Sequence, residues 1–332
     1  MRGADDVVGF EDALRPPVDV RRARIVPGVL RAGRGGGTDA AHARLARIAR
    51  GAPEVMVKIT GRTHDGGHLL SHLQYIGRNG ALSLEGPDRE RVGDREAVRA
   101  LAEAWTSEAA LRPGRRRDTP LSHAVVLSMP RGTAADRLED AARAFAGRVF
   151  GDRFDYVLVL HDEGKHPHVH LTVCSTGRDG RRLDPRKADL QQWREAFAAE
   201  LRARGLEAEA TPRRVRGVVR RPERTAVRKM RERAVAGQGP APRVLEGAVR
   251  DALSADPASA PWRIALVKRQ RRIRRLLLAE AVRLSRSDRG AERALGGLLE
   301  RFVLERPPVE TRADAIRRLA KERERSPPGR SR

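Results

Sequence analysis

The chain has 332 residues and a formal net charge of +24, because 68 lysines and arginines outnumber 44 acidic residues. A charge of this size says little about the fold but indicates a polyanionic partner, of which nucleic acid is the first candidate. The single cysteine excludes an internal disulfide and a cysteine-rich zinc module. No apolar run is long enough for a transmembrane helix and the first residues do not resemble a secretory signal, so we expect a cytoplasmic protein without membrane insertion.

Three regions differ in composition. Residues 1–51 are rich in proline and glycine and predict a flexible N-terminal extension, with a short helix over 39–50. Residues 52–220 alternate strand and helix patterns. Residues 221–332 are arginine-rich and mostly helical in pattern, and their segment 268–284 (KRQRRIRRLLLAEAVRL) runs from a basic stretch into an apolar stripe. This last region is either a helical appendage with solvated faces or a surface for additional DNA contacts or docking.

The central region predicts an α+β fold, in which one antiparallel sheet is backed by helices. Its strand patterns cover 55–60, 81–85, 123–129, 155–161 and 168–174, with a last edge strand over 207–211. Helices are expected over 67–79, over 95–110, after a capping box at Thr133 and Asp136, and after an N-cap at Asp184 followed by Pro185. The buried stripe of the last helix is formed by Leu190, Trp193, Phe197 and Leu201.

Four of the nine histidines lie in the segment HDEGKHPHVHL, residues 161–171. Side chains at positions i and i+2 of a strand share a face, so His168 and His170 project together. A hairpin would bring His161 beside them from the preceding strand. Three converging imidazoles that leave coordination positions open are typical of a catalytic metal site.

Other interpretations of these histidines remain. His166 has the same parity as His168 and His170 and is an alternative to His161 as the third ligand. Pro167 stiffens this stretch and perturbs the strand pairing there. Isolated strand histidines are often no more than satisfied side chains. A second pair, His68 and His72, has metal-binding spacing on a helix, but no acidic residue nearby completes such a site.

The chain has two tyrosines, and only one of them is a candidate nucleophile. Tyr156 lies within an apolar strand pattern and is expected in the core. Tyr75 lies on the helix pattern HLLSHLQYIGRNG, off the apolar face formed by Leu69, Leu73 and Ile76, although it could merely flank the core. A phenol can attack phosphorus, and a divalent ion held by neutral imidazoles stabilises the charge that develops. Nearby basic residues are candidates for contacts with the flanking phosphates: Lys58, Arg62, Arg78 and Arg131.

The segments VKITGR, HLLSHLQYIGRNGALSLE, LSMPRGT and HDEGKHPHVHLTV together resemble the relaxase and mobilisation nuclease family of HUH endonucleases, in particular the branch of the T-DNA border endonucleases. The resemblance covers roughly residues 52–220. It implies a conjugative or mobilisation enzyme that nicks one DNA strand at an origin of transfer and stays linked to the 5′ phosphate. Tyr75 would be the nucleophile and His161, His168 and His170 the ligands of Mg²⁺ or Mn²⁺.

The resemblance also implies an acidic residue near the histidines and several macromolecular partners. The family often has an acidic residue two positions after the first histidine, which here is Glu163, with Asp162 beside it; either would orient a histidine or accept a proton. The partners implied are single-stranded or melted origin DNA, accessory relaxosome proteins and a type IV coupling protein, with export to a recipient cell on the DNA.

Three other functions have features that separate them from this one. HUH replication initiators and transposases place their tyrosine after the histidines, whereas no tyrosine follows His170 here. A non-catalytic DNA-binding protein with a degenerate site would bind without cleavage. A hydrolase that activates water would leave free 5′ phosphates and no protein–DNA link.

Overall fold

The computed structural model describes residues 37–112, 118–162, 166–212, 216–217, 223, 225–253 and 261–325. The chain divides into two compact units. One is Gly51–Ala210, and the other combines Met1–Arg50 with Thr211–Arg332. The first unit contains all the predicted site residues, and the described part of the second is mostly helical.

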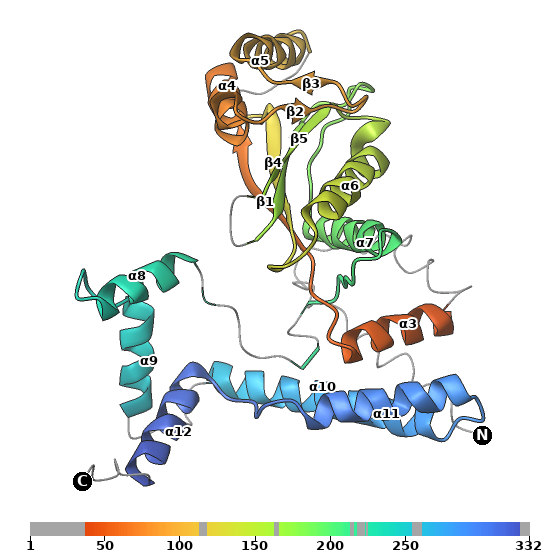
Figure 1. The fold of residues 1–332 in the computed structure, drawn as a ribbon, viewed down its shortest axis with the longest axis vertical. Helices are drawn as coiled ribbons and strands as arrows, with labels where there is room; N and C mark the ends of the chain where they lie inside the picture. Colours follow the sequence, from red (N-terminus) through yellow and green to blue (C-terminus); the bar gives the residue numbers. More distant parts are fainter. Residues whose placement is uncertain are drawn as a thin grey trace. The chain divides into compact units, whose positions relative to one another are not determined.

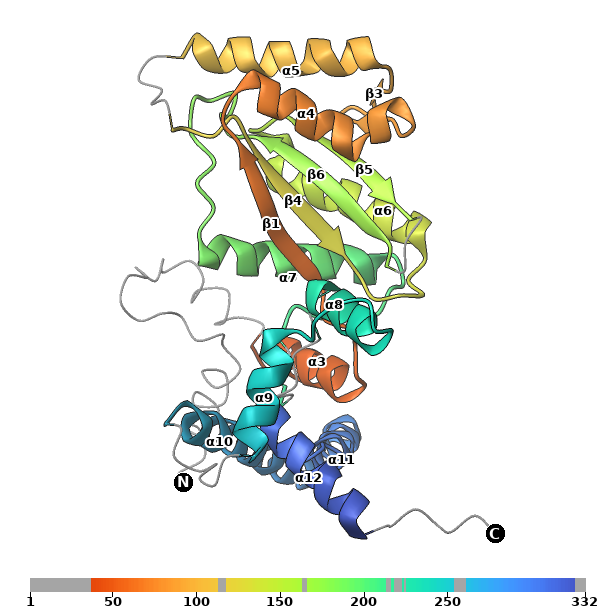
Figure 2. The ribbon, with the colours of Figure 1, turned by 90° about the vertical axis from the view of Figure 1, so that its left-hand side faces the viewer.

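The first unit is built on a six-stranded sheet with the order β1-β4-β6-β5-β2-β3, in which every neighbouring pair is antiparallel (Figure 2). The strands are β1 (Met56–Thr63), β2 (Leu84–Glu85), β3 (Arg91–Val92), β4 (Ser122–Ser128), β5 (Tyr156–His161) and β6 (His168–Cys174). The predicted antiparallel sheet backed by helices is confirmed, although the short β3 was not predicted.

Helices cover both faces of this sheet (Figure 1). On one face lie α6 (Ala135–Ala146) and α7 (Lys187–Ala203), whose aromatic side chains pack edge to face, with ring centroids 5.8 Å apart for Phe145 and Phe197. On the other face lie α4 (Gly66–Ile76) and α5 (Arg95–Ala110). Because strand side chains alternate, Val169 and Leu171 enter the α6–α7 core, while His168 and His170 project to the α4 side.

Two predicted helix starts and one predicted strand differ from the structure, because the local hydrogen bonds are not those expected. The Thr133 hydroxyl donates to the Pro130 carbonyl at 2.8 Å, and α6 begins after Ala134 without a side-chain cap. The Asp184 cap is replaced by Asp189, whose carboxylate accepts the Arg186 N–H at 2.7 Å, so α7 begins at Lys187. The expected edge strand over 207–211 is only an isolated parallel bridge between Glu54 and Glu209.

Buried polar residues join β1, β4 and the segment after β6. The His123 ring is 1% exposed, and its Nδ1 lies 2.9 Å from the Ser175 hydroxyl oxygen. Burial, together with the Arg62 guanidinium, lowers the pKa of His123 to about 4. The folded protein therefore keeps this ring neutral at a pH where the unfolded chain protonates it.

We expect the free energy of unfolding to fall by about 2–3 kcal/mol between pH 7 and pH 4.5 through His123 alone. The unfolded chain takes up a proton below the ordinary pKa of 6.5, whereas the folded chain does so only near 4, so stability is lost as the pH falls through this window. Urea denaturation at both pH values measures the loss, and the His123→Gln variant should lose correspondingly less. An equal loss in the variant would contradict the assignment.

The second unit contains six described helices: α3 (Gly37–Ala49), α8 (Thr225–Val235), α9 (Arg243–Leu253), α10 (Pro261–Ser285), α11 (Gly290–Leu304) and α12 (Arg312–Arg325). Helices α10 and α11 lie side by side (Figure 1) and form a core with Leu45 and Ile48 of α3. Their close approach requires glycine at position 296, because a Cβ there would lie 2.8 Å from the Ala281 carbonyl oxygen. The helical character predicted for the C-terminal region and the helix expected over 39–50 are confirmed. No described helix has the length and apolarity to cross a bilayer.

Candidate metal centre and nucleophile

Three histidines meet where β5 ends and β6 begins. His161 is directly opposite His168 in the β5–β6 pairing, and His170 follows two residues later on the same face. The ring centroids lie 4.5 Å apart for His161 and His170, 5.1 Å for His168 and His170, and 5.2 Å for His161 and His168. One ring nitrogen from each histidine lies within 4.8 Å of the others, so the three can share one ion.

Backbone carbonyls orient two of these rings. His161 Nε2 lies 2.7 Å from the Ile76 carbonyl oxygen, and His168 Nδ1 lies 3.0 Å from the His166 carbonyl oxygen. A carbonyl only accepts, so these nitrogens carry the hydrogens and the other nitrogen of each ring is the one available to a metal ion. Metal-binding histidines typically donate their second nitrogen in this way.

The third ring, His170, is neutral at physiological pH. Burial lowers its pKa to about 4, and the neighbouring His161 and His168 contribute to the same shift. A neutral imidazole is the form that binds a metal ion. The three side chains therefore fit a divalent cation in their geometry, and the low pKa of His170 keeps that ring in the form that binds metal.

A pocket of about 610 Å³ joins the histidines to the end of α4. It is lined by Tyr75, Arg78, Asn79, His161, His168 and His170. The Tyr75 side chain is 71% exposed, whereas Leu69, Leu73 and Ile76 of the same helix are fully buried. The phenol is thus not needed for the core and is accessible to a substrate in the pocket, while Tyr156 is buried, as predicted.

A strained turn after α4 forms one wall of this pocket. Arg78 and Asn79 have φ values of 53° and 56°, in the left-handed region that non-glycine residues seldom adopt. Each such residue costs on the order of 1 kcal/mol or more and persists only where its surroundings hold it. Gly77, just before them, leaves little room for a side chain, because a Cβ would lie 3.2 Å from the carbonyl oxygens of Leu73 and Leu82. The chain reverses sharply here and places Arg78 and Asn79 at the pocket.

Two hydrogen bonds fix α4 to the sheet near the histidines. One is the bond from His161 to the Ile76 carbonyl, and the other joins His72 Nε2 to the Thr172 hydroxyl at 3.0 Å. Thr172 lies two residues after His170 on the same face of β6. The position of Tyr75 relative to the histidines therefore depends on both bonds.

Removing the second bond should slow the DNA cleavage that the family resemblance implies by about 10-fold without changing metal affinity, because a small displacement of a reacting group is costly. We expect this result for Thr172→Val, while Thr172→Ser, which keeps the hydroxyl, should restore the rate. Single-turnover cleavage and Mn²⁺ titration measure the two quantities. Equal rates for the valine and serine variants would show that the bond does not position the helix.

The remaining predicted residues lie at different places. Lys58 is exposed on β1 and pairs with Val126 of β4, which in turn pairs with His170 of β6. Lys58 and His170 therefore lie on the same face of the sheet. Arg131 is exposed in the turn after β4, at the end of the sheet where β6 begins. Arg62, in contrast, pairs with His123, whose side chain faces away from the histidine centre.

The acidic residues and the alternative ligand are not part of the centre as described. Asp162 is exposed just after β5, and Glu163 lies outside the described residues. His166 is exposed and contributes only its carbonyl, so the set of His161, His168 and His170 fits one ion better than the alternative set with His166. The anchoring role of His72 and the pocket position of Asn79 were not predicted; the only signal for the latter was the Asn79-Gly80 stop.

Comparison with known proteins assigns the class. Residues 88–206 match the family described as "Relaxase: MobA/VirD2-like, nuclease domain". The match includes all three histidines and begins after Tyr75. The resemblance inferred from the motifs is confirmed, because this part of the chain matches the nuclease domain of MobA/VirD2-like relaxases.

The individual relatives that the chain is similar to are T-DNA border endonucleases. The chain is similar to the T-DNA border endonuclease VirD2 of Rhizobium radiobacter, with 26% identity over 187 residues, which is 51% of this chain and 44% of that protein. It is also 26% identical over 133 residues to VirD2 of Agrobacterium fabrum and of Rhizobium rhizogenes, covering 36% of this chain and 30% of each relative. The chain thus spans less than half the length of these relatives.

Proposed function

We propose that the protein is a relaxase that cuts one DNA strand at an origin of transfer through covalent attack by Tyr75. The observation that carries this proposal is the shared pocket, in which an exposed tyrosine and three histidines face the same space. The pocket volume of about 610 Å³ is sufficient for a phosphodiester group. The similarity to border endonucleases supports DNA as the substrate.

In the proposed reaction, the Tyr75 oxygen forms a bond to the scissile phosphorus and the bond from phosphorus to the 3′ oxygen breaks. The phenol loses its proton, and the departing 3′ oxygen gains one. The products are a 5′-phosphotyrosyl link and a free 3′ hydroxyl, and attack by that hydroxyl reverses the step. The phenol proton is accepted by solvent or by a carboxylate after β5, for which Asp162 and Glu163 are the candidates.

The centre of His161, His168 and His170 would hold Mg²⁺ or Mn²⁺. When bound, such an ion stabilises the negative charge on the non-bridging oxygens of the phosphate. Arg78 at the pocket, Lys58 on the same sheet face and Arg131 at the same end of the sheet would bind neighbouring phosphates. Arg62 is the weakest of the proposed DNA contacts because it lies beside His123.

The biological role proposed is mobilisation or conjugation of a plasmid or similar element. In that role the protein acts in the cytoplasm on single-stranded or melted origin DNA. Accessory relaxosome proteins and a type IV coupling protein would be its partners, and the DNA-linked protein would pass to the recipient cell.

The test is covalent capture from a pool of single-stranded oligonucleotides with a randomised centre, in the presence of Mn²⁺. We expect a 3′ label to migrate with the protein on denaturing gels, while a 5′ label appears in a shorter fragment that a polymerase can extend. Cleavage that leaves free 5′ phosphates, with no label on the protein, would instead identify a hydrolase that activates water. Binding without any cleavage would identify a non-catalytic DNA-binding protein.

A further inference from the structure

One face of α10 carries a row of exposed basic side chains. Lys268, Arg271, Arg272 and Arg275 are all exposed and follow the spacing i, i+3, i+4 and i+7, which places them on one side of the helix. At 1.5 Å per residue the row extends along about 10 Å of helix. We refer to these four residues as the α10 basic row.

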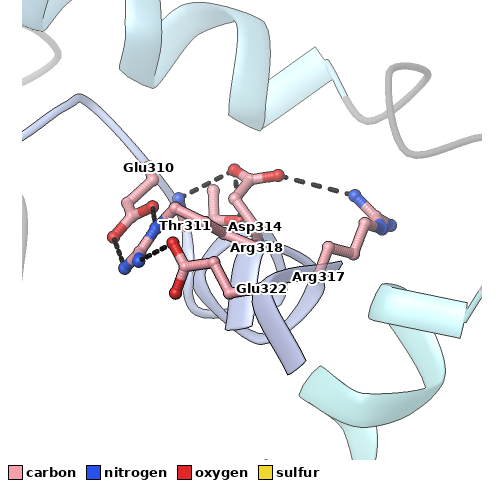
Figure 3. A network of polar contacts seen from close by, with 6 residues as sticks. All are labelled: Glu310, Thr311, Asp314, Arg317, Arg318 and Glu322. Carbon is pink, nitrogen blue, oxygen red and sulfur yellow. Dashed lines mark hydrogen bonds and ion pairs between the residues drawn. The ribbon is translucent and has the colours of Figure 1, made fainter. Parts of the chain in front are cut away.

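The basic row has no carboxylate partners among the described residues. The one acidic residue of α10 is Glu280, and it bonds Arg283 at the far end of the helix. Two arginines of helix α12, in contrast, are paired with carboxylates (Figure 3). There Arg318 is 3.3 Å from Glu310 and 3.0 Å from Glu322, and Arg317 is 3.5 Å from Asp314. The α10 row is therefore uncompensated charge among the described residues, in contrast to the paired arginines of α12.

The opposite face of α10 holds the row in place. Ile273, Leu277 and Leu284 are at most 3% exposed and belong to the core formed with α3 and α11. A basic helix that inserts into a membrane surface needs its apolar face free, and this one is buried. The row is thus a fixed charged surface rather than a membrane-binding amphipathic helix.

We propose that the α10 basic row binds the sugar–phosphate backbone of DNA without sequence preference, as a second contact beyond the nuclease site. This inference rests on the proposed function, which makes DNA the polyanion that the protein meets. Successive phosphates of one strand advance by about 3.4 Å along the axis of a duplex, so a row of about 10 Å spans roughly three of them along that axis. Arginine binds phosphate with two parallel hydrogen bonds, and three of the four residues are arginines.

The chemistry of the surface favours backbone contacts over base contacts. Base stacking uses aromatic side chains, whereas the four residues of the row are one lysine and three arginines. Contacts to phosphate alone carry no sequence information. The row would therefore retain DNA of any sequence while the nuclease unit selects the site.

The test is equilibrium binding of the full-length protein to fluorescein-labelled (dT)30 in EDTA, measured by anisotropy over a range of salt concentrations. The triple variant Arg271→Gln, Arg272→Gln and Arg275→Gln should bind at least about 10-fold more weakly at low salt. Its slope of log Kd against log salt should fall by about 2, because each lost phosphate contact contributes roughly 0.7 with single strands.

The matched control removes the same charge from paired arginines of the same unit: Arg231→Gln, Arg289→Gln and Arg318→Gln, whose partners are Glu223, Glu292 and Glu310. We expect wild-type affinity and slope for this control, and unchanged thermal unfolding by circular dichroism for both triple variants. Wild-type binding by the α10 variant, or equal weakening of both variants, would overturn the proposal. So would loss of binding to polyglutamate or to phosphatidylglycerol vesicles with (dT)30 binding intact.

Binding in EDTA is independent of cleavage, so the two proposals can fail separately. If no covalent adduct forms but the α10 variant alone loses (dT)30 binding, the tyrosine mechanism is wrong and the basic row still binds DNA. If the adduct forms and the α10 variant binds (dT)30 normally, the basic row is not a DNA contact.

Discussion

Replacing Tyr75 by phenylalanine should abolish the covalent protein–DNA adduct and reduce cleavage by about 10³-fold or more, because removal of a covalent nucleophile leaves no equivalent route. The substitution removes one oxygen from a side chain that is 71% exposed, so the free energy of unfolding should change by less than about 0.5 kcal/mol. DNA affinity in EDTA should also be unchanged. Denaturing gels with 3′-labelled DNA and urea denaturation measure these quantities.

The other tyrosine provides the matched control. Tyr156 is buried, and burial raises the pKa of its phenol, so it is a poor nucleophile. Tyr156→Phe should therefore keep full adduct formation. An adduct that persists in Tyr75→Phe and disappears in Tyr156→Phe would reverse the assignment.

Substitution of a proposed metal ligand should have the second large effect. We expect His168→Ala and His170→Ala each to weaken Mn²⁺ binding by at least about 100-fold, since each removes one of three protein ligands and loss of even an outer-shell partner costs 10–100-fold. Adduct formation should fall in parallel, and EDTA should abolish it in the wild-type protein. Isothermal titration with Mn²⁺ measures the affinity directly.

His166 and His161 distinguish the two ligand sets that the sequence allowed. His166→Ala should bind Mn²⁺ like the wild-type protein, because its exposed ring is not part of the centre and its backbone carbonyl remains. His161→Ala should lose binding like the other two ligand variants. The opposite pattern would make His166 the third ligand.

Elements with a clear pattern could be predicted closely. Helix α5 covers Arg95–Ala110 as predicted, because a regular apolar stripe follows Asp94, whose carboxylate accepts the Ala97 N–H at 2.7 Å. The histidine centre could also be predicted, because a period of two and a hairpin are enough to bring His161, His168 and His170 together.

Other features depend on contacts that local sequence does not reveal. Thr133 and Asp184 have the residue types of helix caps, but the Thr133 hydroxyl donates to the Pro130 carbonyl instead, and the Asp189 carboxylate accepts the Arg186 N–H. The bond between His72 and Thr172 joins residues 100 positions apart. Arg62 lies on the face of the sheet opposite to the three histidines because the register of β1 shifts between Ile59 and Gly61. The sequence pattern does not predict this shift.

The pairing of β6 with both β4 and β5 also limits how this centre can change. Side chains alternate between the two faces of a strand, so sliding β6 by one residue would place His168 and His170 in the core formed with α6 and α7. The same shift would turn Val169 and Leu171 toward the pocket. Gradual drift of the ligands along the strand is thus blocked by hydrophobic residues that never touch the ion.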